Sequence, residues 1–233
     1  MVFKGSSVSY TELVQSDEQT YGAMIQLLQA LERAYEVEID AASLDGLDAS
    51  LTGASGLFEG QCGEWVKRGA AIVRQEKGRL CEARENGNEE DCLDQLAASY
   101  AHLFLGVAEL DPIAPFESVY CGAEGVLYTK SYFQVMEHLK EWDYIKPSGF
   151  MDAEDHVAIE LDFINTLVER ARAAFADGDG ERAALLLGEI SAFKEQHVDM
   201  WVPQLCDDII KDDGGGFYSG VAYATKAVVE LLG

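Results

Sequence analysis

The segment GFMDAEDHVAIELDFINTLVERA, residues 149–171, indicates most clearly what kind of fold this chain adopts. Asp152 is a good N-cap residue for a helix, and Asp155 places a second carboxylate in the expected first turn, at the positive end of the helix dipole. The apolar residues that follow recur with the period of an α-helix and form one stripe: Val157, Leu161, Ile164, Leu167 and Val168. The segment therefore predicts an amphipathic helix with an acidic N-terminus.

His156 and Glu160 lie one helical turn apart at the edge of this stripe, and Asp155 is expected to face away from the core. Four interpretations are open: a metal site, acid–base catalysis, recognition of a partner, or simple capping of the helix. A zinc or iron site needs further ligands at helical spacing, and the other histidines are isolated in the sequence. Catalysis with His156 as base lacks a nearby nucleophile elbow or phosphate loop.

The helical period continues on both sides of this segment. Further apolar stripes lie within residues 24–35, 93–104, 131–142, 185–193 and 217–231. Strand patterns are nearly absent, with ESVYCG (117–122) as the one ambiguous run. The sequence predicts an all-α, single-domain helical bundle of about ten helices.

The stretch 109–128 contains two prolines and two glycines and is the clearest non-helical part of the chain. We expect it to be an irregular connecting segment between an N-terminal half, about residues 1–108, and a C-terminal half, about residues 129–233.

The composition and net charge of the chain indicate which classes of molecule it could bind. The 233 residues are 48% hydrophobic and 10% aromatic, which is typical of a globular protein, and the formal net charge is −25. Such a chain repels nucleic acid and anionic lipid and attracts cationic partners, although the charge could equally serve only solubility. The five cysteines include no C-x-x-C pair, and the first residues lack the apolar region of a signal peptide. We expect a cytoplasmic protein with reduced thiols.

Four short motifs in register carry a family resemblance. DAEDHVAIEL (152–161) is similar to the E-P-x-D-H-x-x-x-E-L signature of the TorD/DmsD-type redox-enzyme maturation chaperones, with Ala153 in place of the proline. The stretches that resemble the other family motifs are SYAHLFLG (99–106), APFESVY (114–120) and FKEQHVDMWVPQL (193–205). The resemblance covers about residues 95–230; the first 90 residues match only in being helical. The missing proline leaves the start of the helix less rigid than in the family.

The resemblance implies a non-catalytic, all-helical cytoplasmic chaperone. Family members bind the twin-arginine leader and the apo-form of a molybdopterin oxidoreductase catalytic subunit, assist cofactor insertion and delay export. The aspartate–histidine pair of the family motif, here Asp155 and His156, is implicated in leader binding. The resemblance further implies no permanently bound cofactor, weak binding of guanine nucleotide, and a monomer or a homodimer that swaps halves through a hinge reaching to residue 150.

The residues themselves offer a binding mode for such a leader. Carboxylates accept guanidinium groups, and Asp155, Glu160 and Asp152 could supply them. An apolar groove would hold the rest of the peptide as a helix. Candidates for that groove are Trp65, Tyr100, Phe104 and Trp201, with core packing as the alternative for each of them, above all for Tyr100 and Phe104. His156 would make binding pH-sensitive near neutrality if its pKa were unperturbed.

Two alternative functions stay open at this point. One is an assembly chaperone of the nitrate-reductase kind, whose client has no functional leader. The other is a helical metal-dependent enzyme centred on His156 and Glu160. A basic run at 67–84 holds six of the 17 cationic residues and could contact an acidic client surface or a nucleotide phosphate, but a solvated helix face is the favoured interpretation.

Overall fold

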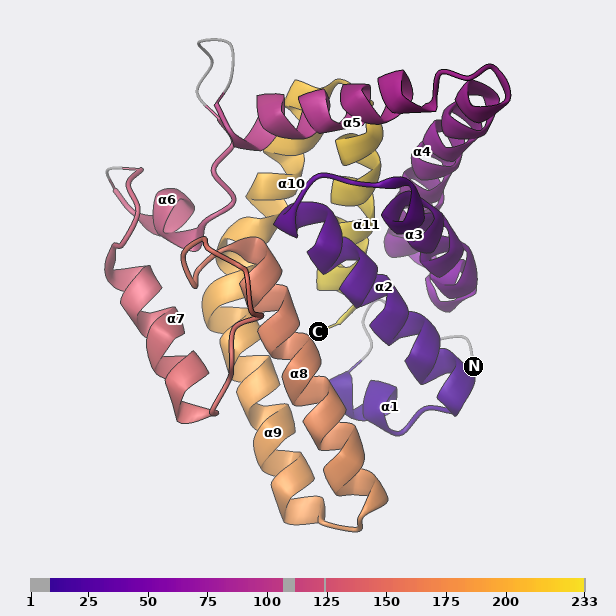
Figure 1. Cartoon of the computed structure of the whole chain (residues 1–233). Coiled ribbons are helices and arrows are strands. Elements are labelled where there is room, and N and C mark those ends of the chain that lie inside the picture. Colours follow the sequence, from indigo (N-terminus) through magenta and orange to yellow (C-terminus); the bar gives the residue numbers. More distant parts are fainter. Residues whose placement is uncertain (1–8, 107–111, 124, 233) are drawn as a thin grey trace.

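The structure, a computed structural model, describes residues 9–106, 112–123 and 125–232 of the chain. Within these ranges it is built from helices, with one isolated antiparallel bridge between Phe116 and His156 (Figure 1). The helices are α1 (Tyr10–Val14), α2 (Glu18–Glu36), α3 (Ala41–Ala54), η1 (Ser55–Leu57), α4 (Gly60–Glu85), α5 (Glu89–Phe104), α6 (Glu117–Cys121), α7 (Lys130–Glu141), α8 (Val157–Ala176), α9 (Gly180–Phe193), η2 (Lys194–Val198), α10 (Asp199–Asp213) and α11 (Phe217–Leu231). The all-α prediction is confirmed.

The apolar stripes of the sequence become the inner faces of these helices. Every member of the α8 stripe is buried, and so is the stripe of α2 from Met24 to Tyr35. Leu185 is an exception, since it is 62% exposed on α9 while Leu186 and Ile190 face the core. The buried apolar residues form one continuous cluster that extends from Tyr10 to Leu232. One core of this kind defines a single helical domain.

Helix α11 lies at the centre of the domain and joins its two halves. It packs most extensively against α4 and also against α10, while α8 packs against α9 and α2. In Figure 1 the yellow C-terminal helix lies behind α2 and next to the magenta helices of the N-terminal half. The two halves of the sequence are therefore packed into the same core.

Two glycines permit the close contact between α4 and α11. A Cβ atom on Gly69 would lie 2.7 Å from the carbonyl oxygen of Gly220, and one on Gly220 would lie 3.0 Å from Cγ2 of Ile72. Neither glycine has a positive φ. These glycines therefore serve helix packing rather than a special backbone conformation.

The long helical rod formed by α9, η2 and α10 contains a π-helical turn at residues 194–198. Pro203 follows in α10, and because proline has no N–H it cannot donate to the carbonyl of Asp199. The wider turn places His197 in the protein interior with 2% of its surface exposed. Single π-turns inside α-helices occur frequently at functional sites.

The connecting segment is less irregular than predicted. Residues 117–121, the ambiguous ESVYC run, form the short helix α6, and residues 109–111 and 124 lie outside the described residues. Helix α7 follows at the outer edge of the domain, where α6 is its main neighbour (Figure 1). Among the described residues, no helix is long and apolar enough to cross a membrane.

Candidate functional site

Backbone hydrogen bonds connect the Asp155–His156 pair, the D-H motif, to the ESVY motif at residues 117–120. The N–H of Glu117 donates to the carbonyl oxygen of Asp155 at 2.9 Å, and the N–H of Val157 donates to the carbonyl oxygen of Pro115 at 2.9 Å. These two bonds produce the antiparallel bridge between Phe116 and His156. Two motifs separated by about forty residues of sequence are thus one structural unit.

The side chain of Asp155 adds a third hydrogen bond between the two motifs. Its Oδ2 accepts a hydrogen bond from the backbone N–H of Ser118 at 2.8 Å, and the residue is 0% exposed. Burial raises the pKa of this carboxyl group, and the hydrogen bonds from Ser118 act in the opposite direction. The expectation that Asp155 faces away from the core is therefore wrong.

The helix also begins later than predicted. Helix α8 starts at Val157, and His156 is its N-cap, with Nδ1 accepting from the N–H of Ala158 at 3.1 Å. Asp152, the predicted N-cap, is exposed and precedes the helix. The reason is tertiary, because the bonds to residues 115–118 hold residues 155–157 in a bridge instead of a helical turn.

His156 is enclosed by apolar rings. The rings of Phe116 and Phe150 each lie 5.1 Å from the imidazole, measured between ring centroids. Burial lowers the pKa of His156 to about 3, so the ring is neutral at physiological pH. A neutral ring agrees with its role as acceptor at the helix N-terminus, and the predicted pH sensitivity near neutrality is not supported.

Glu160 belongs to a buried polar cluster that we call the carboxylate cluster, consisting of Glu117, Asp155, Glu160, His197 and Trp201. The indole N–H of Trp201 donates to Oε2 of Glu160 at 2.9 Å, and His197 Nδ1 lies 2.9 Å from Oε2 of Glu117. Each of the five is at most 2% exposed. Burial, and then the neighbouring carboxyl of Glu117, raises the pKa of Glu160 well above its usual range. Burial therefore favours the protonated form of the Glu160 carboxyl group.

This burial corrects the sequence-based picture of the site. Asp155, His156 and Glu160 do not form an exposed ridge, because all three point into the protein. Three oxygens in this region have no hydrogen-bond partner among the described residues: Asp155 Oδ1, Glu160 Oε1 and Ser118 Oγ. Unpaired buried oxygens are costly and unusual in native proteins, which marks the unit as more than packing.

The four predicted groove aromatics do not form a groove. Tyr100 and Phe104 are core residues of α5, with ring centroids 5.1 Å apart in a tilted arrangement, and both rings contact that of Tyr218. Trp201 is 1% exposed and lies within the carboxylate cluster. Trp65 is half-buried on α4, beneath the ammonium group of Lys226 at 5.2 Å.

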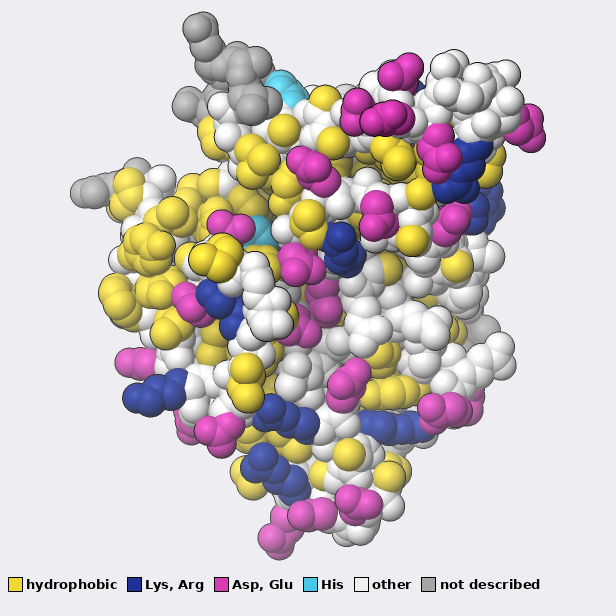
Figure 2. All heavy atoms as spheres, viewed as in Figure 1, with side chains coloured by type: hydrophobic (Ala, Val, Ile, Leu, Met, Phe, Trp, Pro, Cys, Tyr) yellow, Lys and Arg dark blue, Asp and Glu magenta, His cyan; other side chains and the backbone are white. Residues whose placement is uncertain are grey.

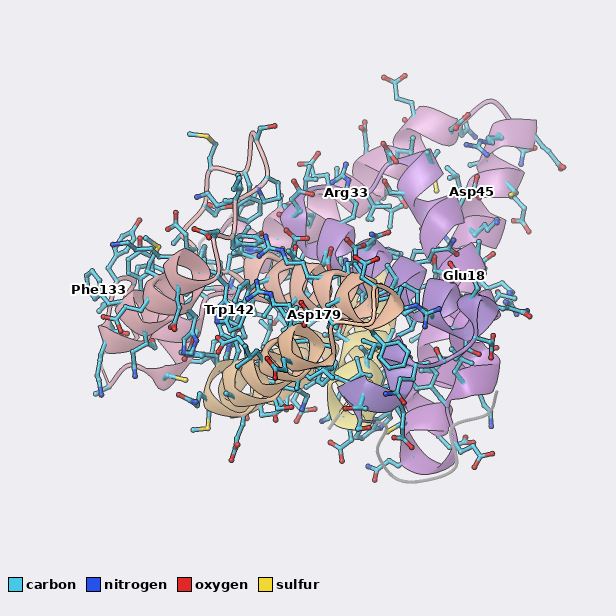
Figure 3. All side chains as sticks on the ribbon, turned by 90° about the horizontal axis from the view of Figure 1, so that it is seen from below. Glu18, Arg33, Asp45, Phe133, Trp142 and Asp179 are labelled. Carbon is cyan, nitrogen blue, oxygen red and sulfur yellow. The ribbon has the colours of Figure 1, made fainter. Side chains whose placement is uncertain are left out.

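A different apolar surface lies next to the carboxylate cluster. A hollow of about 500 Å³ opens between α6, α7 and the π-turn, with Glu117 and Gln196 among its lining residues. Val126 and Met200 also line it and are 49% and 65% exposed. Figure 2 shows hydrophobic side chains gathered over the α6–α7 side of the molecule, and Figure 3 shows Phe133 at its outer edge. We call this region, residues 126–136 together with Met200, the α7 surface.

Sequence reasoning missed the α7 surface, although a signal for it was present. Helix α7 buries Val135 and Leu139, which are the members of its regular stripe. Phe133 and Met136 lie outside that stripe and are 58% and 37% exposed. Apolar residues on a second face of a helix indicate a second contact surface.

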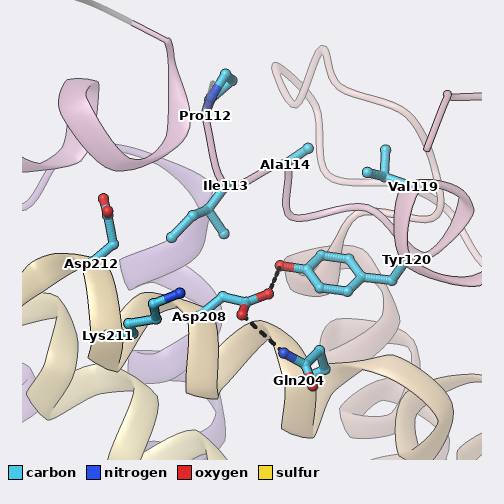
Figure 4. Close-up of a pocket in the computed structure, with 9 residues that line it drawn as sticks. All are labelled: Pro112, Ile113, Ala114, Val119, Tyr120, Gln204, Asp208, Lys211 and Asp212. Atoms are coloured by element: carbon cyan, nitrogen blue, oxygen red, sulfur yellow. Dashed lines mark hydrogen bonds between the residues drawn. The ribbon is translucent and has the colours of Figure 1, made fainter. Parts of the chain in front are cut away.

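A second hollow of about 500 Å³ lies between residues 112–120 and α10 (Figure 4). Three of its polar groups bond together, since Asp208 accepts from the Tyr120 hydroxyl at 3.2 Å and from the Gln204 amide at 2.9 Å. Lys211 and Asp212 also line this hollow, and Asp212 lies 3.4 Å from Nε2 of His102.

The basic run on α4 is neutralised by acidic neighbours. Lys77 bonds to Asp45 and Asp48, and Arg84 to Glu89. The remaining basic side chains of the run also have partners on the same or neighbouring helices, namely Lys67 with Glu64, Arg74 with Asp48, Arg79 with Glu76, and Arg68 over the ring of Tyr223. The run is therefore a paired helix face rather than a phosphate-binding surface.

A metal centre at His156 and Glu160 finds no support in the geometry. In residues 9–106, 112–123 and 125–232, no group of three or more His, Cys, Asp or Glu side chains is placed so that it could hold a metal ion. His156 is used as a helix cap, and Glu160 is bonded to Trp201.

An all-helical domain with this motif unit defines a class of protein, and comparison with known proteins identifies that class. Residues 68–207, more than half of the chain, match the family described as nitrate reductase delta subunit, and the chain belongs to this family. All four motifs lie within the matched region. The expected TorD-type family membership is confirmed.

Several relatives carry the name chaperone protein TorD. The chain is 28% identical over 132 residues to the protein of Aliivibrio fischeri, which is 57% of this chain and 60% of that protein. It is 28% identical over 149 residues to the Photobacterium profundum protein, covering 62% and 67% of the two chains. It is 30% identical over 146 residues to a Vibrio cholerae protein, covering 61% and 63%. The chain thus matches about three-fifths to two-thirds of these relatives' length, and no solved structure matches it.

Proposed function

We propose that this protein is a cytoplasmic chaperone that binds the leader and the apo-form of a molybdopterin oxidoreductase catalytic subunit, assists insertion of its cofactor and delays its export. The observation that carries the proposal is that three of the family motifs, at residues 114–120, 152–161 and 193–205, meet in one buried unit with an exposed apolar surface beside it. Relatives named chaperone protein TorD match 57% and 62% of the chain. An enzyme would need reactive groups open to substrate, whereas the carboxyl groups of Asp155 and Glu160 and the imidazole of His156 are enclosed.

In this proposal the buried residues of the motifs and the exposed residues beside them have different roles. Asp155, His156 and Glu160 shape the unit from within, and the α7 surface supplies exposed apolar area for the leader. Contiguous apolar patches of this kind commonly mark protein–protein contact sites. An apolar leader segment that is helical when bound suits such a surface, in the helix-in-groove mode of recognition.

The test is calorimetric titration of the protein with a synthetic twin-arginine leader. We expect binding near micromolar Kd, about −8 kcal/mol, that weakens when the two arginines are replaced by lysines. The variant Val126→Ser/Met200→Gln should bind several-fold more weakly, because it removes apolar area from the α7 surface. The matched control Phe175→Ser/Leu185→Gln changes two equally exposed apolar residues on α8 and α9 and should bind normally.

A second candidate function follows from the family description. Because the family is described as nitrate reductase delta subunit, an assembly chaperone for a client without a functional leader is the alternative. In that case leaders from several oxidoreductases would fail to bind, while a catalytic subunit without cofactor would still co-purify with the chaperone. Weak guanine nucleotide binding and a swapped dimer are further proposals that rest on the family resemblance alone.

A further inference from the structure

A small acidic pocket lies on the other side of the D-H motif from the α7 surface. Its volume is about 230 Å³, and it is enclosed by α2, the start of α8 and the loop before α8. We call it the α2–α8 pocket. Its lining residues are Gln29, Glu32, Arg33, Glu36, Pro147, Phe150, Ala158, Ile159 and Asp162. Phe150 and Ala158 connect it directly to His156, through a ring contact and a hydrogen bond.

The carboxylates of this pocket have no cationic partner within the described residues. Oε1 of Glu32 is inaccessible and forms no hydrogen bond, and no ion pair reaches Glu36 or Asp162. Asp162 accepts a single bond from the hydroxyl of Tyr144. Burial, and then Asp162, Glu169 and Glu36, raise the pKa of Glu32 to about 9. With a pKa of about 9 Glu32 is protonated near neutral pH, and a cationic group bound beside it would favour release of that proton.

The basic side chains nearby are engaged elsewhere. Lys146 bonds to Glu154 and to the carbonyl oxygen of Asp152. Arg170 donates to the carbonyl oxygens of Trp142 and Asp143. Arg33 is the one basic member of the lining, and its Nη1 has no partner among the described residues, so it does not neutralise Glu32 through a hydrogen bond.

The rest of the pocket suits a flat cationic group on an apolar stem. Pro147 and Phe150 provide apolar walls, and a guanidinium group can stack on an aromatic face as well as bond to carboxylates. The same loop presents Ile145 and Met151, which are 87% and 90% exposed. The pocket and its rim therefore offer acidic and apolar contacts together, which is what a polypeptide with arginines followed by apolar residues requires.

We propose that the α2–α8 pocket binds an arginine side chain of a partner polypeptide through Glu32, Glu36 and Asp162. This inference rests on the proposed function in that it assigns a subsite for the arginines of the leader. It replaces the sequence-based assignment of arginine binding to Asp155 and Glu160, which are buried. Arg33 would turn its free Nη1 to the backbone of the bound segment.

The test is a titration cycle with two proteins and two leader peptides. Glu32→Gln/Glu36→Gln keeps side-chain shape and removes the two carboxyl groups of α2 that could carry negative charge beside a bound arginine. We expect it to bind the twin-arginine leader about tenfold more weakly than the unmodified protein, and to lose most of its preference for arginine over lysine. The control Glu181→Gln/Glu230→Gln removes two exposed charges elsewhere and should keep that preference.

The outcomes separate the subsite from the function. If the leader binds and the pocket variant behaves like the control, the inference is wrong and the proposed function stands. If no leader binds the intact protein, the proposed function fails, and argininamide then tests the pocket directly. Amide NMR signals of residues 29–36 should shift with argininamide in the unmodified protein and not in the pocket variant. Equal responses in both proteins would overturn the inference.

Discussion

Asp155 joins two segments that lie far apart in the sequence, and its removal should be costly. Alanine at this position would leave the buried N–H of Ser118 without its acceptor. We predict that Asp155→Ala lowers the free energy of unfolding by about 2 kcal/mol, since an unpaired buried donor costs about 1–3 kcal/mol. Asp152→Ala, three residues away and exposed, should change it by less than about 0.5 kcal/mol. Urea denaturation of both variants measures the difference, and equal values would contradict the assigned role.

Glu160 should make stability depend on pH with a definite sign. Its folded-state pKa is raised, so the unfolded chain releases the proton first as pH rises, and the folded state becomes relatively less stable. The stability that protonated Glu160 contributes is fully present below its unfolded pKa of about 4.3 and is lost as pH rises through the raised folded value.

Glu160→Gln removes this titration and keeps an acceptor for the indole of Trp201. We predict that the variant matches the unmodified protein in unfolding free energy near pH 4.5 and exceeds it at pH 8. Denaturation at both pH values tests this. A variant that is less stable at pH 8 than the unmodified protein would mean that Glu160 is ionised in the fold.

At the level of helices, contact between α4 and α11 depends on Gly69. A methyl group there would meet the backbone of Gly220 at 2.7 Å, and backbone atoms cannot move aside as a flexible side chain does. We predict that Gly69→Ala lowers the unfolding free energy by about 1–3 kcal/mol. The control is Gly78→Ala in the same helix, where a Cβ meets nothing within 4 Å, and which should stabilise by about 0.5–1 kcal/mol. Stabilisation by both substitutions would show that the two helices are farther apart.

The sequence predicted most helices correctly but the start of α8 incorrectly, because apolar periodicity is a local pattern and the start of α8 is set by tertiary hydrogen bonds. Helical periodicity depends on local order of apolar residues, and that order is enough to place the stripes of α2, α5 and α11. The beginning of α8 depends on the hydrogen bond that Val157 donates to Pro115 and the one that Asp155 accepts from Ser118, and no local pattern reveals either. For the same reason Asp155 was expected to be exposed, since helical spacing alone does not show that another segment covers it.

For the whole molecule, the net charge of −25 should assist binding of a basic leader. We predict that leader affinity falls steadily as sodium chloride rises from about 50 to 500 mM, because the Debye length shrinks over this range to a few ångströms. A Lys-Lys leader has the same charge and should lose affinity in parallel. Affinity that is independent of salt would mean that apolar contact alone carries the binding.

The sequence located the motif residues that form the buried unit, but it did not predict the exposed surfaces beside them. The motifs located the unit because their order matches that of the family. The α7 surface and the α2–α8 pocket arise from residues that meet only in the folded chain, such as Glu36 with Asp162 or Val126 with Met200. The residues of the motifs are largely internal, and the surfaces around them come from elsewhere in the chain.

The most direct test of the central claim is an amide NMR titration of the isotope-labelled protein with the twin-arginine leader. The account predicts shifts in two groups of residues, 126–136 on the α7 surface and 29–36 with 147–151 around the α2–α8 pocket. Signals of α9 between residues 180 and 190 should remain unchanged. Shifts confined to other helices, or no shifts at a leader concentration well above micromolar, would contradict the claim that this domain is a leader-binding chaperone.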